Sequence, residues 1–132
     1  MKNQAKQVVT EFLNAVKEVN TEKLGQLLHA DVEWIQPGNN QLSGLKKSSG
    51  EVFQMVGKMF ELSANTIRLT DVKSITVTGN RVACLLEWKA TEPSGKILEV
   101  DNIDVYTVED GKIIGAEVFS SDVAHEDHFW GN

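Results

Sequence analysis

Apolar residues recur three or four positions apart in three segments of the N-terminal half. This spacing places them on one side of a helix, so each segment is expected to form an amphipathic helix. Asn20 or Thr21 is expected to cap the second helix, and Ser48 or Ser49 precedes the third. The apolar positions of the three helices span residues 8–16, 24–28 and 52–60.

The other patterned segments predict β-strands. Residues 31–36 alternate between apolar and polar side chains and predict a short strand, which the turn at residues 37–40 ends. In the second half, β-branched runs are separated by Gly79-Asn80 and Asp110-Gly111, both typical of hairpin turns. The strands expected there span residues 65–69, 72–78, 81–91, 96–108 and 112–121. The tail, residues 122–132, is expected to form a helical turn that docks its aromatic residues.

The order of these elements indicates an α+β fold. Helices precede a run of long antiparallel strands, so three N-terminal helices are expected to pack on one face of a strongly curved, mostly antiparallel sheet. The chain has 132 residues, which is the size of one domain, and the sequence contains no internal repeat or linker. We therefore expect a single domain over residues 1–132.

Charge and composition exclude several classes of function. The 13 basic residues are outnumbered by 19 acidic ones, giving a net charge of −6, which argues against binding to nucleic acid or to anionic membranes. No apolar run approaches the roughly 20 residues that span a bilayer. Residues 1–6 lack a signal-peptide core, so a cytoplasmic location is expected. The single cysteine, Cys84, excludes an intrachain disulfide and a cysteine-based metal cage, and is expected to be a buried hydrophobic residue.

Short motifs along the whole chain resemble a known family. They are residues 12–15 (FLNA), 24–28 (LGQLL), 31–34 (DVEW) followed by 37–38 (PG), 42–44 (LSG), 105–113 (VYTVEDGKI) and 129–131 (FWG). In this order the chain resembles the SnoaL-like, ketosteroid-isomerase-like branch of the nuclear-transport-factor-two-like superfamily. The resemblance implies a cone-shaped, cystatin-like α+β barrel with an apolar pocket at its wide end. It also implies a homodimer formed through the outer face of the sheet. It says little about the reaction, because this fold carries many different activities.

Asp104 is the first candidate for chemistry. Aspartate is depleted from strand interiors, yet Asp104 lies inside a predicted strand and shares a face with Tyr106. The resemblance aligns Asp104 with the acid of the ketosteroid isomerase oxyanion hole, which stays protonated in an apolar site and donates a hydrogen bond. The alternative is an Asp104 that is solvated or paired with a lysine or arginine of a neighbouring strand.

The other parts of the isomerase site are not matched. The resemblance implies a carboxylate base near the end of the first strand, where the nearest residues are Trp34, Ile35 and Gln36. Phe12 stands where it implies a tyrosine. The carboxylate of Glu33 is expected to point outward, opposite Trp34. Glu117 is the substitute candidate for a general base, if it points inward. The alternative is a solvated or ion-paired Glu117.

Several large side chains are candidate walls of the pocket. With Gln36 and Tyr106 as polar groups, they would suit a small, flat, apolar ligand. The alternative is that each is ordinary core. These candidates are Phe12, Trp34, Met59, Trp88 and Phe119.

Neither a cofactor nor a metal is expected. A helical tail would bring His125, His128 and Asp122 onto one face, as a zinc site requires. Because short terminal segments fray, a zinc site is not the favoured interpretation of the tail. His29 is expected just past the second helix, where the helix dipole accounts for it.

Two kinds of function stay open. The first is an enzyme in which Asp104 and Tyr106 polarise a small apolar carbonyl compound while Glu117 or water moves a proton, giving isomerisation, cyclisation, dehydration or epoxide opening. The second is a module without catalysis, either a carrier or sensor of a small ligand or a dimer whose pocket is incidental.

Overall fold

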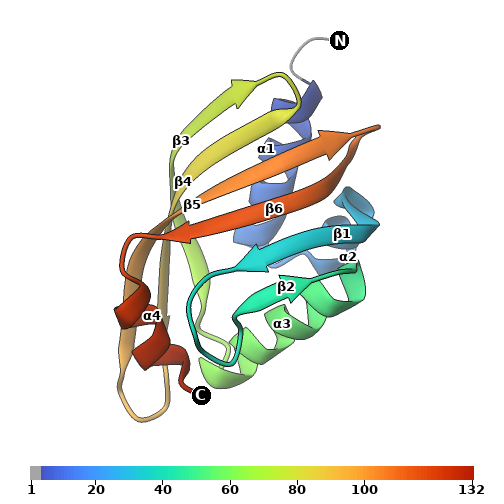
Figure 1. Ribbon diagram of the computed structural model, residues 1–132. Coiled ribbons are helices and arrows are strands. Elements are labelled where there is room, and N and C mark those ends of the chain that lie inside the picture. The colour runs from blue at the N-terminus through green and yellow to red at the C-terminus, as the bar shows by residue number, and fades with distance from the viewer. Residues whose placement is uncertain (1–3) are drawn as a thin grey trace.

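The computed structural model, which describes residues 4–132, combines four helices with one six-stranded sheet within that range (Figure 1). The helices are α1 (Gln4–Glu18), α2 (Thr21–Leu27), α3 (Ser49–Leu62) and α4 (Val123–Trp130). The strands are β1 (Leu28–Gln36), β2 (Gly44–Lys46), β3 (Arg68–Thr78), β4 (Arg81–Thr91), β5 (Ile97–Glu109) and β6 (Lys112–Ser120). The predicted α+β fold is confirmed. The first three residues, used above in the expectation of a cytoplasmic location, lie outside the described residues.

The sheet is mixed and open. Its strand order is β2-β1-β6-β5-β4-β3. All neighbours in this order pair antiparallel except β1 and β6, which are parallel. The strand β2 was not predicted, because three residues with one apolar side chain carry no alternation to detect. Since β2 and β3 are opposite edges, the curved sheet does not close into a complete barrel.

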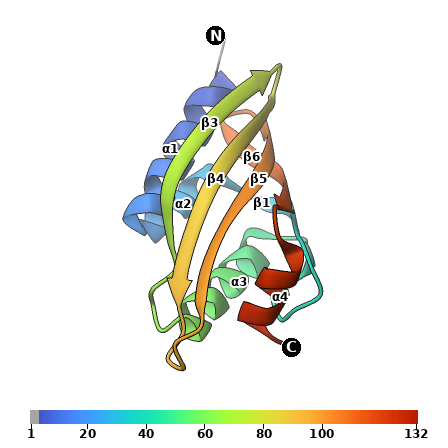
Figure 2. The same cartoon turned by 90° about the vertical axis from the view of Figure 1, so that its left-hand side faces the viewer.

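Helices α1, α2 and α3 lie on the concave side of the curved sheet, and α4 lies beside β5 at one end (Figures 1 and 2). Local hydrogen bonds fix where two helices begin. Asn20 Oδ1 accepts from the Lys23 N–H at 3.1 Å, and Ser48 Oγ accepts from the Glu51 N–H at 3.1 Å. Of the alternative caps, Asn20 and Ser48 therefore hold the N-cap positions.

Alternation along β5 and the second half of β6 decides which side chains face the helices. On β5 the even-numbered residues from Leu98 to Val108 are buried and the odd-numbered ones are more exposed. On β6 the buried positions include Ala116 and Val118. Because successive side chains of a strand point to opposite faces, Glu117 and Phe119 belong to the outer face.

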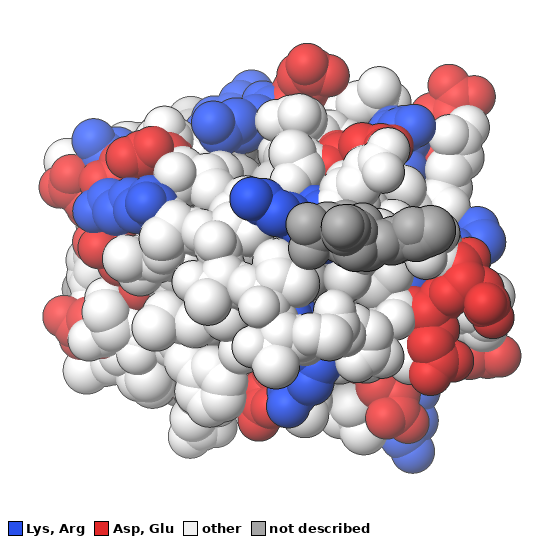
Figure 3. Space-filling model, turned by 90° about the horizontal axis from the view of Figure 1, so that it is seen from above, with Lys and Arg blue, Asp and Glu red and all other residues white. Residues whose placement is uncertain are grey.

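The surface is mixed in charge. Seen from above, charged side chains of both signs surround a central area of uncharged ones (Figure 3). Across residues 4–132, no helix combines the length and the apolar character needed to cross a membrane.

Candidate functional site

A cavity of about 120 Å³ lies between α1, α3 and the concave face of the sheet. Its wall is mainly apolar, with contributions from Phe12 of α1, Met55 of α3 and Val100 of β5. An engineered cavity of roughly 150 Å³ in another protein holds benzene, so the enclosed space is of the order of one ring. A longer ligand would extend into the adjoining hollow, which shares Val19, Phe53 and Arg68 with the cavity wall. The apolar wall excludes water from the few polar groups that face the cavity.

The most unusual of these groups is the pair formed by Asp104 and Tyr106. Both side chains are buried, with exposed fractions of 2% and 1%. The Tyr106 hydroxyl donates to Asp104 Oδ2 at 2.7 Å. The other oxygen, Oδ1, is buried and has no hydrogen-bond partner among the described residues. It is therefore the atom of this pair that is free to meet a ligand.

Burial sets the protonation of Asp104. Loss of water disfavours the charged carboxylate and raises the pKa of Asp104 to about 7; the Tyr106 hydrogen bond lowers this pKa, while the negative charge of Glu126 raises it. Burial likewise raises the pKa of Tyr106, so its hydroxyl stays protonated. Asp104 thus exists in both protonation states near neutral pH, as a group that exchanges protons must.

Two aromatic rings pack against Tyr106 and hold it in place. The centroid of the Tyr106 ring lies 5.5 Å from that of Phe12 and 6.0 Å from that of Trp34. The Trp34 Nε1–H donates to Gln36 Oε1 at 3.0 Å. Both aromatic contacts of Tyr106 are edge-on, which is a favourable arrangement for aromatic pairs. These contacts fix the orientation of the Tyr106 ring, and with it the direction of the hydroxyl toward Asp104 Oδ2.

Glu126 of α4 is a second buried carboxyl on the cavity wall, with an exposed fraction of 4%. Burial raises the pKa of Glu126, and contacts with Ser120 and Trp130 offset part of this effect. The Asn102 amide is oriented so that its Nδ2 donates to Glu126 Oε2 at 3.0 Å, since the opposite orientation sets its oxygen against acceptors only. Glu126 was not among the candidate site residues expected from the sequence.

A signal for Glu126 was present in the sequence. Once residues 122–132 are taken as helical, Glu126 precedes Trp130 by four positions and shares a side of the helix with it. Trp130 and Phe129 are both buried, as the expected docking of the tail requires. The same docking carries Glu126 to the cavity.

Most of the candidate residues from the sequence lie together. Asp104 and Tyr106 face the cavity from β5. Five further candidates line it from α1, α3, β1 and β4: Phe12, Trp34, Gln36, Met59 and Trp88.

Glu117 and Phe119 require a correction. Both were expected in the pocket, and neither lines it. They do share a face of β6, as the alternation predicted, but Ala116 and Val118 occupy the inner face. Phe119 is 50% exposed on the outer side. Glu117 therefore does not serve as a base inside this cavity.

The tail histidines take part in local contacts. His125 Nε2 accepts from the Glu99 N–H at 3.3 Å, and the His128 carbonyl accepts from Lys96 Nζ at 2.9 Å. In the part of the chain that is described, no group of three or more histidine, cysteine or acidic side chains could hold a metal ion. Cys84 is buried, as expected, and burial raises the pKa of its thiol to about 12.

Comparison with known proteins decides the family. The model of the SnoaL-like domain matches residues 9–116, which is most of the chain. The protein belongs to the SnoaL-like domain family. No curated protein sequence matches it.

Solved structures with a similar fold agree with the assignment of this chain to the SnoaL-like family. A protein of unknown function with a cystatin-like fold from Xanthomonas campestris is 33% identical, with a TM-score of 0.92 over 97% of this chain and 98% of that one. Bal32a, from a soil-derived mobile gene cassette, is 22% identical, with a TM-score of 0.91 and 98% of both chains covered. IdmH, a proposed polyketide cyclase from Streptomyces antibioticus, is 19% identical, with a TM-score of 0.77 over 93% of this chain and 96% of that one. The last two show a shared fold.

Proposed function

We propose that this SnoaL-like protein binds a small apolar molecule with a carbonyl or hydroxyl oxygen and catalyses an acid–base reaction on it. The observation that carries the proposal is the Asp104 carboxyl. It is buried in an apolar cavity, has a pKa of about 7, and keeps Oδ1 without a partner among residues 4–132. A carboxyl with these properties delivers or accepts a proton where water does not compete.

The two carboxyl oxygens of Asp104 have different roles. Tyr106 donates to Oδ2, so the proton of the neutral acid is best placed on Oδ1, on the side of the ligand. Protonated Asp104 donates to the ligand oxygen and stabilises negative charge that develops there. The binding site then consists of Asp104, Tyr106 and the cavity wall. The wall residues that contact the ligand are Phe12, Trp34, Gln36, Met59 and Trp88.

Glu126 replaces Glu117 as the second proton-transfer group. Isomerisation, cyclisation and dehydration each need one proton delivered at oxygen and one removed at carbon. Glu126 lines the same cavity, and its raised pKa leaves a carboxylate more basic than a solvated glutamate. The proposed cyclase activity of IdmH, which shares the fold, favours cyclisation among the three.

Deuterium exchange tests the chemistry without knowledge of the natural substrate. The probe is 2-tetralone, a two-ring ketone with exchangeable hydrogens next to its carbonyl, incubated with the protein in deuterium oxide. The wild type should speed exchange, and Asp104→Asn should abolish the acceleration because an amide does not transfer the proton. Asp31→Asn is the matched control, since Asp31 is exposed and absent from the cavity wall. Equal exchange rates for wild type and Asp104→Asn would refute catalysis by Asp104.

A binding module without catalysis is the second candidate. Phe12 favours it, because it lacks the hydroxyl that the family resemblance implies at this position. The base that the resemblance implies near the end of the first strand is also missing, since Trp34, Ile35 and Gln36 carry no carboxylate. The same experiment separates the candidates. A carrier binds 2-tetralone with retention of its hydrogens, whereas an enzyme exchanges them.

We also propose that two copies associate through the outer face of the sheet. Leu85, Ile103 and Phe119 are paired in register across β4, β5 and β6. Ile103 is 46% exposed and Phe119 50%, so the row is only half covered within one copy. Contiguous exposed apolar side chains typically mark an interaction surface. The cytoplasmic location and the single domain over residues 1–132 stay predictions.

A further inference from the structure

The cavity contains a second buried polar atom that lacks a partner. Trp88 Nε1 and Asp104 Oδ1 are the two buried side-chain nitrogen or oxygen atoms without a hydrogen bond in the described part of the chain, and both side chains line the same cavity. A buried donor without a partner is costly, and most such groups in folded proteins are satisfied. A ligand that accepts from Trp88 Nε1 removes this cost.

The two side chains start from different levels of the sheet. Trp88 is paired with Val100, and Asp104 lies four residues further along β5. At ~3.3 Å per residue, the two levels of the sheet are roughly 13 Å apart. A ligand that meets both groups is therefore elongated and carries a polar group at each end.

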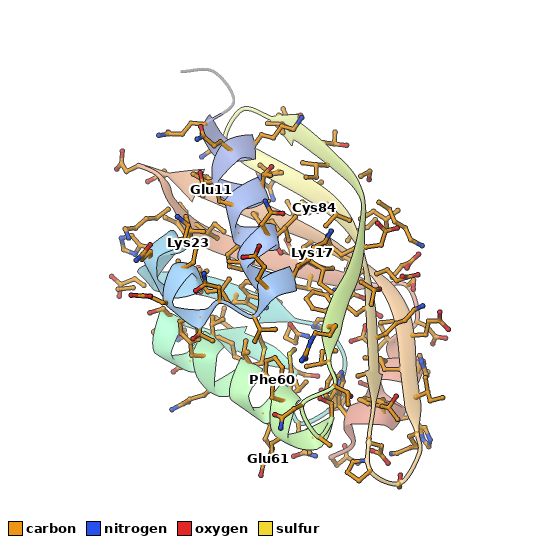
Figure 4. The ribbon with its side chains drawn as sticks, turned by 180° about the vertical axis from the view of Figure 1, so that it is seen from behind. Glu11, Lys17, Lys23, Phe60, Glu61 and Cys84 are labelled. Atoms are coloured by element: carbon orange, nitrogen blue, oxygen red, sulfur yellow. The ribbon has the colours of Figure 1, made fainter. Side chains whose placement is uncertain are left out.

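A positive charge lies at the Trp88 end. Leu69, which follows Arg68, is paired with Trp88. Arg68 lines both the cavity and an adjoining hollow between the α1–α2 connection, α3 and the start of β3. The guanidinium carbon lies 5.7 Å from the centroid of the Phe60 ring. Figure 4 shows Phe60 near the C-terminal end of α3, where the chain turns toward β3.

Arg68 is held in place yet has no acidic partner. Its Nη1 donates to the carbonyls of Asn65 at 2.9 Å and Ile67 at 2.7 Å. Among residues 4–132, no carboxylate lies within ion-pair distance of it. In a chain of net charge −6, an anchored arginine without a carboxylate partner is suited to bind an anion from outside.

We propose that the ligand is an elongated apolar carboxylic acid, whose carboxylate accepts hydrogen bonds from Trp88 Nε1 and the Arg68 guanidinium while an oxygen at its other end meets Asp104. The orientation follows from charge. One end holds the Asp104 carboxyl, and the Glu126 carboxyl is hydrogen-bonded to Asn102, two residues before Asp104 on β5. Both carboxyls repel an anion, whereas the end at Trp88 holds Arg68. This inference rests on the proposed function, because it names the substrate class of the same cavity.

A matched pair of probes tests the inference. The first is 6-hydroxy-2-naphthoate, and the second is 6-hydroxy-2-naphthamide, which has the same shape without the charge. Binding of each is measured by calorimetry at pH 7 with the wild-type protein. We expect the carboxylate to bind at least about tenfold more tightly, the order expected of one hydrogen bond to a charged group.

Variants assign the preference to residues. Arg68→Gln should remove most of the preference for the carboxylate, and Trp88→Phe should reduce it by a smaller factor, because it removes one N–H and keeps a ring. Arg81→Gln is the matched control, because Arg81 is an exposed arginine outside the cavity wall and should leave the preference unchanged.

The outcomes separate this inference from the proposed function. Equal affinity of the wild type for both probes would overturn the carboxylate inference and leave ligand binding in the cavity intact. A preference that survives in Arg68→Gln and Trp88→Phe would also overturn it. Failure of both probes to bind at millimolar concentration would contradict the proposed function and, with it, this inference.

Discussion

Asp104 combines three properties that single residues rarely share: complete burial, a raised pKa and one oxygen without a partner in the described structure. Each follows from its place on β5, where the alternation turns Asp104 and Tyr106 inward among aromatic rings. Burial of a carboxyl without a cationic partner favours its neutral form. The same physical cause that prepares Asp104 for chemistry makes the fold sensitive to pH.

We predict that the free energy of unfolding falls as the pH rises. The unfolded chain ionises Asp104 near its ordinary pKa of 3.8, whereas the folded protein holds the proton up to about 7. Stability from this group is complete below the lower value and is lost as the pH approaches the higher one, by up to about 4 kcal/mol.

Urea denaturation of wild type and Asp104→Asn between pH 4 and pH 8 measures this loss. Glu126 has a raised pKa and contributes a slope of the same sign in both proteins, so the difference between them isolates Asp104. Parallel curves for the two proteins would contradict the prediction.

Tyr106→Phe should shift the titration of Asp104 upward. The Tyr106 hydrogen bond lowers the pKa of Asp104, so removal of the hydroxyl leaves burial less opposed and raises this pKa above about 7. The midpoint is read from the ¹³C resonance of the Asp104 carboxyl. An unchanged or lowered midpoint would show that Tyr106 does not control the proton.

At the scale of elements, α4 connects distant parts of the chain to the cavity. Asp127 Oδ1 accepts from the Asn39 N–H and from Asn40 Nδ2, both at 2.8 Å. These bonds tie the loop between β1 and β2 to α4, whose Glu126 and Trp130 line the cavity. The position of the loop is therefore coupled to the wall of the site.

Gly38→Ala should break this connection. Gly38 has a φ of +91°, and a Cβ there would collide with Asp127 Oδ1. We expect a loss of about 2–4 kcal/mol in unfolding free energy, from backbone strain plus hydrogen bonds to a charged group. Gly44→Ala is the matched control: its φ is +107°, but nothing lies within 4 Å of the added Cβ, so strain alone should cost about 1–2 kcal/mol. Equal losses in urea denaturation would contradict the role of Asp127.

Local pattern predicted most elements, including β4 with the boundaries that the structure has. Two predicted strands, residues 65–69 and 72–78, proved to belong largely to β3, whose register shifts interrupt the pattern.

The sequence also indicated an inward Asp104 as one of two alternatives, because aspartate is depleted from the interior of strands. The side taken by Glu117 was not indicated: alternation separates two faces, and only the packing of the helices decides which is inside. The spacing to Trp130 placed Glu126 on the docked side of α4, but its arrival at the cavity depends on where α4 packs against β5, which the sequence does not show.

On the scale of the whole molecule, the sheet has two different faces. The concave face holds the helices and the cavity, and the outer face presents the apolar row of Leu85, Ile103 and Phe119. A second copy would cover that row without blocking the hollow at Arg68, which lies on the helix side. The proposed ligand site and the proposed dimer interface thus lie on opposite sides of one sheet.

Ile103→Asp should convert the proposed dimer to a monomer, because it places a charge in the centre of the apolar row. Ile97→Asp is the matched control on the same face of β5, at the end of the strand where Ile97 is 64% exposed. Light scattering should give about twice 14.6 kDa for the wild type and the control, and a single chain mass for Ile103→Asp. A wild-type protein that scatters as a single chain at micromolar concentration would refute the dimer.

The labelling rate of the single cysteine, Cys84, measures how often the structure around it opens. Cys84 lies opposite Asp104 in the pairing of β4 and β5 and is 1% exposed. An alkylating reagent reaches this sulfur only while the strands and helices around it part, so the rate of labelling counts those openings. A molecule seated against Asp104 should slow that rate in proportion to its occupancy, and any binder can be ranked by mass spectrometry without a dye or an assay of turnover.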